Sequence, residues 1–536
     1  MANSSRAAFV AGGKRLRSLV AYLIPALLVG SGPAGPAVGE VRTPAIVGDH
    51  MVLQREKPIV VWGWAGPGEG VTVSLADQSA TATADDKSGA WRVALPAQPA
   101  ATGKTLTVRG DGNELVFADV AIGEVWVCSG QSNMEWPVNK SGNGDLILAA
   151  ATRPDIRLIT VAGPGSQTPQ EDFHGEWRVG SPRSVAPFSA VGYGFGRRIA
   201  DTVGIPVGLI DNAWGGSACE AWVPRDKLAN APFFQPMMKW VLATESKTNA
   251  QQEAEQYQEQ LALWKRAVAN AEARGALPPE MPRARGFSIG NRRAGNLYNA
   301  RVHPILGYTI RGAIWYQGES NAARAAEYRD LFPMMIQSWR DAWGQGDFPF
   351  YWVQLADFLA EQTGPEESNW AELRESQTLT LDRLPSTGQA VIIDLGEASD
   401  IHPRNKQEVA NRLARHALAK DYGLDIACES PRYASIEVAD GKAVVTFSGV
   451  RRRLRTFDAK QVEGFVIRGA DGKWRPANAK LLKGNRVEVS SPDVAVPVAV
   501  RYAWANNPVC NLYDATGLPV TPFRTEVRPT DPAATP

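Results

Sequence analysis

The run AIGEVWVCSGQSNM occupies residues 121–134 and decides the fold of the chain. Its first part, residues 121–128, is a short apolar run that predicts a buried strand. GQSNM at 130–134 follows at once and places Ser132 at a strand-to-helix turn, where a serine Oγ is exposed beside backbone N–H groups. The pattern is not the GxSxG elbow, and a serine in this context also suits a helix cap. Ser132 is therefore a candidate nucleophile that needs support from other residues.

Four more short apolar runs repeat this pattern, with helix-like segments between them. They lie at 206–211, 311–316, 350–355 and 390–394. Strands that alternate with helices indicate a parallel sheet covered on both faces. We therefore predict an α/β domain over residues 121–425.

Residues 226–295 interrupt the alternation of strands and helices. Within this region, residues 251–274 carry Ala, Leu and Trp on one helical stripe and contain no Gly or Pro, which predicts a long helix. A loop rich in Pro and Arg follows. We interpret this region as a helical insertion over the α/β domain, which either only packs there or forms a rim of the substrate site.

Both ends of the chain that follows residue 39 have sequence patterns typical of β-strands. Residues 40–120 contain runs at 58–64, 71–75 and 105–109 that are rich in Val, Thr and Trp, separated by Gly, Pro and Asp, as in an antiparallel β-sandwich. Residues 426–530 return to this pattern. They form a second β-domain or a second half of the first one, packed with the N-terminal domain.

Composition excludes several classes of partner. The chain has 536 residues, and a single hydrophobic core rarely exceeds about 250–300 residues, so we expect two or three domains. Its formal net charge of +1 gives no field for nucleic acid or an anionic membrane, so neither is an expected partner. Four cysteines are too few for a disulfide framework, and Cys428 and Cys510 either pair or remain thiols. No Cys or His spacing indicates a metal.

Residues 1–39 are typical of a signal peptide. Lys14, Arg15 and Arg17 precede an apolar run at 19–30, and small residues follow. The apolar run is too short for a bilayer, which needs about 20 residues. We expect a secreted or periplasmic protein with no membrane contact after cleavage; an uncleaved anchor is the alternative.

A serine nucleophile needs a base, and the chain has only five histidines. His402 follows the run 390–394 by a short loop, which places it at the carboxyl end of a strand, where open α/β sheets form their active sites. His416 is expected on an exposed helix face. His402 is the predicted base, ahead of His303. The other two histidines are His50 and His174.

An acidic residue is expected to orient the imidazole of His402. Asp400 lies two residues before it and is the leading candidate. Asp394 and Glu397 remain open, as does a dyad that uses a backbone carbonyl.

An oxyanion also needs hydrogen-bond donors. The expected donors are the N–H of Ser132, the glycines of AWGG at 213–216, and side chains of YQGESN at 316–321. The named candidates are Gly215, Gly216, Gln317 and Asn321, with Glu319 as a buried acceptor that locks these loops.

Four motifs together resemble the sialate O-acetylesterase family of the SGNH hydrolases. They are GQSNM (130–134), NAWGGS (212–217), IWYQGESN (314–321) and DIHPRNK (400–406). HMVLQR and VWGWAGPGE, beginning at His50 and Val61, resemble the β-domain of bacterial members. The resemblance covers nearly the whole mature chain. It implies a three-layer α/β/α SGNH-hydrolase domain with flanking β-domains, no cofactor and no metal.

The resemblance also assigns roles by position. It makes Ser132 the nucleophile, His402 the base and Gln317 the side-chain donor of the oxyanion hole. The family pattern places Asp three residues before His, where this chain has Ser399, so the acid moves to Asp400. The implied reaction removes O-acetyl groups from a carbohydrate, either sialic acid or a plant cell-wall polysaccharide such as xylan or xyloglucan, through an acetyl-enzyme. A carbohydrate-binding protein with an inactive esterase domain is the alternative, and the oligomeric state stays open.

Overall fold

Strand β7 (Glu114–Gly130) carries most of the run quoted above and ends two residues before Ser132. The computed structural model describes residues 39–526, except 275, 277, 278, 280, 363, 365, 366 and 458. Apart from its last residue, the predicted signal peptide lies outside these described residues. Within them, no helix combines the length and apolar character needed to cross a membrane.

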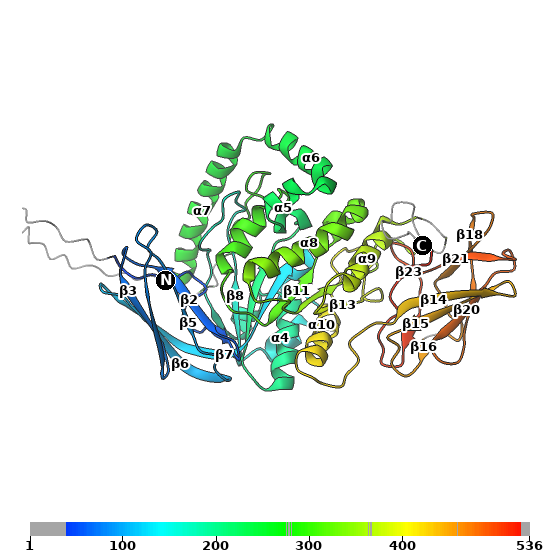
Figure 1. Ribbon diagram of the computed structural model, residues 1–536, viewed down its shortest axis with the longest axis horizontal. Helices are drawn as coiled ribbons and strands as arrows, with labels where there is room; N and C mark the ends of the chain where they lie inside the picture. The colour runs from blue at the N-terminus through cyan, green and yellow to red at the C-terminus, as the bar shows by residue number, and fades with distance from the viewer. Residues whose placement is uncertain are drawn as a thin grey trace, which may run out of the picture. The chain divides into compact units, whose positions relative to one another are not determined.

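The second half of β7 lies in the middle of a parallel sheet (Figure 1). The other strands are β8 (Arg153–Thr160), β9 (Arg178–Gly180), β10 (Val207–Ala213), β11 (Gly312–Tyr316), β12 (Phe350–Val353) and β13 (Thr387–Ala390). Their order is β13-β12-β11-β7-β10-β8-β9, and only β9 runs antiparallel to its neighbour. The parallel strands predicted after residue 121 and at 206–211, 311–316 and 350–355 are therefore present.

Successive residues of β7 point to opposite faces of the sheet, as the pleat requires. Val125 and Val127 join one hydrophobic cluster, which also takes in α8 (Ala325–Trp343) and α9 (Asn369–Leu379). Trp126 and Cys128 join a second cluster with α4 (Ala190–Val203) and α10 (Lys406–Lys420). Figure 1 shows the two pairs of helices on opposite sides of the sheet. Each face of the sheet is thus buried by helices.

The short helices and single turns lie mostly in the loops between strands. The helices are α1 (Ser132–Glu135), α2 (Gly144–Ala149) and α3 (Pro182–Val185). The turns are Val138–Lys140, Cys219–Trp222, Pro232–Phe234, Tyr298–Val302, His303–Ile305, Glu319–Arg324 and Thr380–Asp382.

The region predicted as an insertion is helical. It contains α5 (Arg225–Asn230), α6 (Gln235–Glu245) and α7 (Ala250–Ala273). The long helix predicted at 251–274 corresponds to α7 within one residue at each end. A loop then returns the chain from residue 281 to the α/β part.

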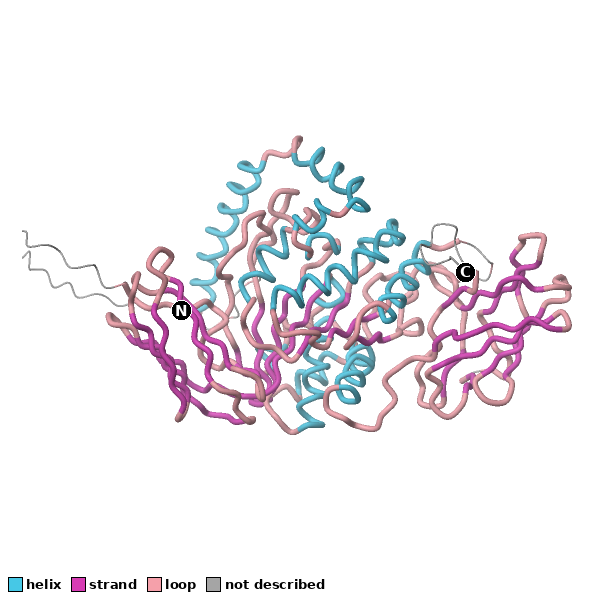
Figure 2. The backbone as a smooth tube through the Cα atoms, in the orientation of Figure 1, coloured by secondary structure: helices cyan, strands magenta, loops and turns pink. Residues whose placement is uncertain are grey.

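Figure 2 shows that strands dominate both ends of the described chain. The N-terminal strands are β1 (Val52–Gln54), β2 (Ile59–Trp64), β3 (Gly70–Leu75), β4 (Gln78–Thr83), β5 (Ala90–Leu95) and β6 (Ala101–Arg109). All pair antiparallel except β1, which runs parallel to β7. Strand β6 pairs with the first half of β7, so one continuous strand passes through residue 120 and joins the β-structure to the parallel sheet.

The C-terminal strands form further antiparallel sheets with their own hydrophobic cluster. They are β14 (Arg432–Ala439), β15 (Lys442–Ser448), β16 (Leu454–Thr456), β17 (Phe465–Gly469), β18 (Trp474–Pro476), β19 (Asn478–Leu481), β20 (Arg486–Ser490), β21 (Pro497–Tyr502), β22 (Leu512–Asp514) and β23 (Phe523–Arg524). Hydrogen bonds tie this region to the α/β part; buried Arg374 of α9 donates to the carbonyls of Ala505 and Asn506.

Two expectations need correction, and one that was left open is resolved. The strand predicted at 390–394 ends at Ala390, because the next residues pack into two hydrophobic clusters and do not pair with β12. His416 is buried rather than exposed, and its ring stacks on Tyr351. Cys428 and Cys510 are free thiols, as are the other two cysteines.

Candidate active site

Three strand ends meet next to Ser132. Gly130 of β7 pairs with Ala213 of β10 on one side and with Tyr316 of β11 on the other. Gly130 has a φ of +136°, and a Cβ there would lie 2.2 Å from the Tyr316 carbonyl oxygen. Only glycine fits such a turn. The chain leaves the sheet here and starts α1 at Ser132.

The structure brings Ser132 and His402 together from positions 270 residues apart. His402 Nε2 lies 2.9 Å from Ser132 Oγ, within hydrogen-bond distance. The His402 ring stacks on Trp136, with a centroid distance of 4.9 Å and an angle of 18° between the planes. Trp136 follows α1, so the segment that carries the serine also supports the face of the histidine ring.

The three candidate acids have different partners. Asp400 Oδ1 lies 3.4 Å from His402 Nδ1 and accepts the His402 backbone N–H at 2.9 Å. Asp394 instead forms a two-pronged pair with Arg412, with contacts of 2.6 and 2.8 Å. Glu397 accepts the Arg404 backbone N–H at 2.7 Å. Asp400 is thus the carboxylate among these three that contacts the imidazole.

The surroundings of His402 favour its neutral form. Burial lowers its pKa, and the ammonium of Lys406 lowers it further, against the opposing effect of Asp400. A neutral imidazole with its proton on Nδ1 can accept the Ser132 hydroxyl proton at Nε2. The pair can therefore act as a nucleophile and a general base.

The expected oxyanion donors differ in availability. Gly215 and Gly216 form a tight turn, in which Gly216 has a φ of +73°. The Gly215 N–H already donates to Glu135 Oε2 at 2.8 Å. Across the described residues, no hydrogen bond engages the N–H of Ser132 or of Gly216. These two groups are the donors of the expected set that remain open to a substrate.

Gln317 does not fit the expected role of oxyanion donor. It is fully buried, and its amide donates to Asn321 Oδ1 at 2.7 Å and to the Ser217 carbonyl at 3.2 Å. Its carbonyl oxygen accepts the Tyr328 hydroxyl. Both ends of the side chain are occupied, so Gln317 braces the loops after β10 and β11 against each other.

Asn321 and Glu319 also brace these loops. Asn321 accepts the Cys219 backbone N–H at 2.9 Å and donates to Glu220 Oε2 at the same distance. Glu319 lies beside the site with its Oε2 atom buried, and its Oε1 accepts from Asn133 Nδ2 at 2.6 Å. Burial raises the pKa of Glu319.

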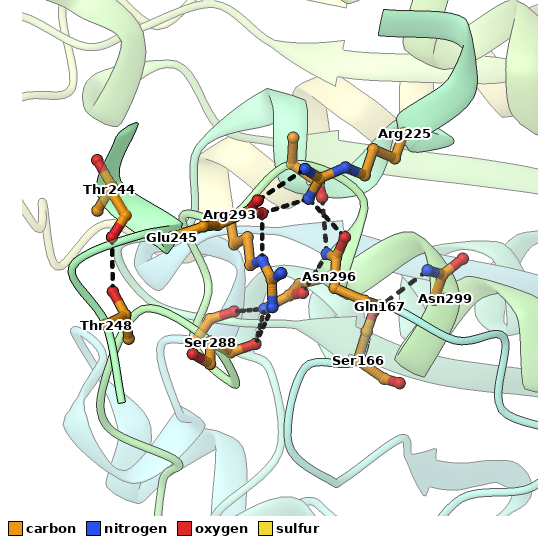
Figure 3. A network of polar contacts seen from close by, with 12 residues as sticks. Ser166, Gln167, Arg225, Thr244, Glu245, Thr248, Ser288, Arg293, Asn296 and Asn299 are labelled. Atoms are coloured by element: carbon orange, nitrogen blue, oxygen red, sulfur yellow. Dashed lines mark hydrogen bonds and ion pairs between the residues drawn. The ribbon is translucent and has the colours of Figure 1, made fainter. Parts of the chain in front are cut away.

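The insertion reaches the site through its last loop. Asn291 donates to the Gly215 carbonyl at 2.5 Å, and Arg283 lies 3.0 Å from Glu135 Oε2. Figure 3 shows the network that anchors this loop: Glu245 at the end of α6 pairs with both Arg225 and Arg293. The insertion thus contributes to the surroundings of the Gly215 turn.

Three further residues of the site lie in or beside the sequence motifs, but their spacing did not identify them as functional. Asn133 and Glu135 stand inside or beside the GQSNM motif, and Lys406 closes the DIHPRNK motif. The burial of Lys406 and the hydrogen bond that Glu135 accepts from Gly215 become apparent only in the structure. Among the described residues, no cluster of His, Cys, Asp and Glu could hold a metal ion.

Comparison with known proteins decides the family. The model of the family described as carbohydrate esterase, sialic acid-specific acetylesterase, matches residues 122–278 and 285–419. The chain belongs to this family. The sialate O-acetylesterase of Mus musculus is 29% identical over 91% of this chain and 94% of its own length. That of Homo sapiens is 28% identical over 90% and 92%.

A solved structure of a carbohydrate acetylesterase from Xanthomonas citri is 38% identical, with a TM-score of 0.74. The match covers 91% of this chain and 100% of that one. Like these relatives, the chain is a carbohydrate O-acetylesterase, and its mixed α/β fold with flanking antiparallel sheets agrees with that membership. The alternative of a purely carbohydrate-binding protein is not favoured.

Proposed function

We propose that Ser132 removes O-acetyl groups from a carbohydrate in two steps. Ser132 Oγ attacks the acetyl carbonyl while His402 takes its proton, and the sugar hydroxyl leaves with a proton from His402. His402 then takes a proton from a water molecule that attacks the acetyl-enzyme; the bond from Ser132 Oγ to the acetyl group breaks, acetate leaves, and Ser132 Oγ receives the proton from His402. The 2.9 Å contact between Oγ and Nε2 is the observation that carries this proposal.

The oxyanion of each step is assigned to the N–H groups of Ser132 and Gly216. Gly215 joins them only when Glu135 releases its N–H, because the carboxylate accepts that hydrogen bond at present. Asp400 is assigned to orient His402. We assign the helices on the two faces of the sheet to a three-layer α/β/α arrangement.

Turnover of 4-nitrophenyl acetate tests the nucleophile. Ser132→Ala should lower kcat by at least about 10³-fold, since removal of a catalytic serine leaves only binding and oxyanion stabilisation. Ser141→Ala is the matched control, because Ser141 Oγ donates to the Val138 carbonyl. A Ser132→Ala variant that keeps more than a tenth of the wild-type rate would rule out the assignment.

The sugar is assigned to O-acetylated sialic acid or plant cell-wall polysaccharide. The rodent and human relatives are sialate O-acetylesterases by name, and the bacterial one is a carbohydrate acetylesterase. Acetate release from acetylated sialosides, xylan and xyloglucan should identify the class. Ser132-dependent turnover of the small ester without acetate release from any carbohydrate would refute the carbohydrate assignment.

We also assign the chain to the periplasm or the extracellular space on the basis of residues 1–39. Expression of the full chain in a bacterial host, followed by fractionation, should give an N-terminally shortened protein outside the cytoplasm. Retention of the intact chain in the membrane fraction would favour the anchor instead.

A further inference from the structure

A buried lysine lies behind the Ser132–His402 pair. Lys406 is the first residue of α10 and has no solvent exposure. Its Nζ donates to Asn133 Oδ1 at 2.5 Å, and no carboxylate of the described residues lies within salt-bridge distance of it. Nζ also lies 5.8 Å from the centroid of Trp136 and 5.4 Å from that of Tyr316. An unpaired ammonium is costly to bury, so this position needs an explanation.

Asn133 connects Lys406 to the rest of the site. Its side-chain amide accepts from Lys406 and donates both to Glu319 Oε1 at 2.6 Å and to the Ile401 carbonyl at 3.0 Å. Ile401 directly precedes His402, and Asn133 directly follows Ser132. One side chain therefore ties the serine turn to the histidine loop. Glu319 Oε2 has no hydrogen-bond partner in the described part of the chain, and the positive charge of Lys406 favours the ionised form of this carboxylate.

Lys406 also acts on His402 electrostatically. The two residues contact the same Trp136 ring. The charged groups that face His402 are Asp400 from its own loop and Lys406 from α10. Those that face Lys406 are Glu319 after β11, with Asp400 and Glu397 from the histidine loop. Burial lowers the pKa of Lys406 to about 7, so its ammonium is charged under the mildly acidic conditions where a histidine titrates.

We propose that Lys406, joined to Glu319 through Asn133, is a positioning residue that holds His402 against Ser132 and keeps its imidazole in the neutral form required of a base. The ammonium does this by repelling a second positive charge, and its hydrogen bond to Asn133 keeps the two catalytic segments in register. This role rests on the proposed function of Ser132 and His402. Lys406 thereby supplies a positive charge from α10 to a site whose other residues follow the ends of the strands.

The test separates the charge of Lys406 from its hydrogen bond. Lys406→Gln removes the charge but retains a donor for Asn133, whereas Lys406→Met removes both. Lys420→Met, at the other end of α10, is the matched control, because Lys420 contacts Glu429 and the Thr387 carbonyl away from the site. For each variant, kcat/KM for 4-nitrophenyl acetate is measured from pH 4.5 to 8.5. The titration of His402 is followed in parallel by NMR, with His402→Asn to assign its signal.

Loss of the charge should move the acidic limb of kcat/KM and the NMR midpoint of His402 to higher pH by about 0.5–1 unit, a shift typical of a unit charge within about 10 Å. At pH 8 Lys406→Gln should keep kcat within about threefold of wild type, and Lys406→Met should fall by about tenfold. Lys420→Met should match wild type throughout.

An unchanged limb and midpoint in folded Lys406→Gln would overturn the proposal. If Lys406→Met does not fold, Lys406→Gln still tests the proposal. The NMR midpoint distinguishes the two levels of inference. If the wild type shows no Ser132-dependent turnover, the proposed function fails, while a shifted His402 midpoint still supports the electrostatic role of Lys406.

Discussion

Replacement of Asp400 by Asn tests how strongly the acid contributes to catalysis. The substitution removes the negative charge but keeps the shape and an oxygen that can still accept the His402 backbone N–H. The contact at stake joins Asp400 Oδ1 and His402 Nδ1 across 3.4 Å, beyond the usual range of 2.7–3.2 Å. The two side chains are 36% and 27% exposed, so water weakens their interaction.

These features set the expected magnitude. Replacing a buried, well-bonded triad aspartate by Asn costs about 10⁴-fold in kcat, or about 5.5 kcal/mol. An exposed ion pair contributes about 0.2–1 kcal/mol, and a hydrogen bond to a charged group about 1.5–3 kcal/mol. The long and partly exposed contact of Asp400 lies between the last two cases. We therefore expect a cost of about 1–2 kcal/mol, which is about a 5- to 30-fold fall in kcat.

The assay is kcat for 4-nitrophenyl acetate at pH 8, with circular dichroism as the check on folding. Glu397→Gln serves as a comparison, because Glu397 accepts a backbone N–H of Arg404; its kcat should stay within about threefold of wild type. A loss above about 10³-fold in Asp400→Asn would show that the acid is bound much more tightly than the geometry implies. A loss below twofold would show that Asp400 does not orient His402. Either result would refute the reasoning.

Three further predictions follow from buried contacts. Glu124 is fully buried and pairs with Arg55 and Arg311 at 2.6 Å each, so Glu124→Ala should lower the free energy of unfolding by about 3–5 kcal/mol in urea titration; a change below 1 kcal/mol would contradict this. Gly130→Ala should cost about 2–4 kcal/mol in the same assay, because a Cβ would collide with a carbonyl oxygen of β11. Its kcat should fall as well. In the wild type, the acidic limb of kcat/KM should have its midpoint below about pH 6.5, since the pKa of His402 is lowered and its neutral form persists to lower pH; a midpoint above pH 7 would be inconsistent.

The alternation of apolar strands and helices was sufficient to predict the parallel sheet and the position of Ser132. Both depend on local properties: the apolar run that ends in β7, and a glycine turn that no other residue tolerates. The same local patterns predicted helix α7 and the β-structure at each end. They misplaced the strand at 390–394, because an apolar residue can pack into a core without pairing in a sheet.

The sequence by itself determined the nucleophile candidate and, through the scarcity of histidine, the candidate base. Tertiary structure decided which of the remaining groups are available to them. It commits the Gln317 amide to Asn321 and Ser217, Asp394 to Arg412 and the Gly215 N–H to Glu135, and it buries Lys406 beside the pair. The reason is that burial and hydrogen-bond partners depend on segments far apart in the chain. The spacing of residues along one segment carries no information about which distant group will occupy a donor or surround a charge.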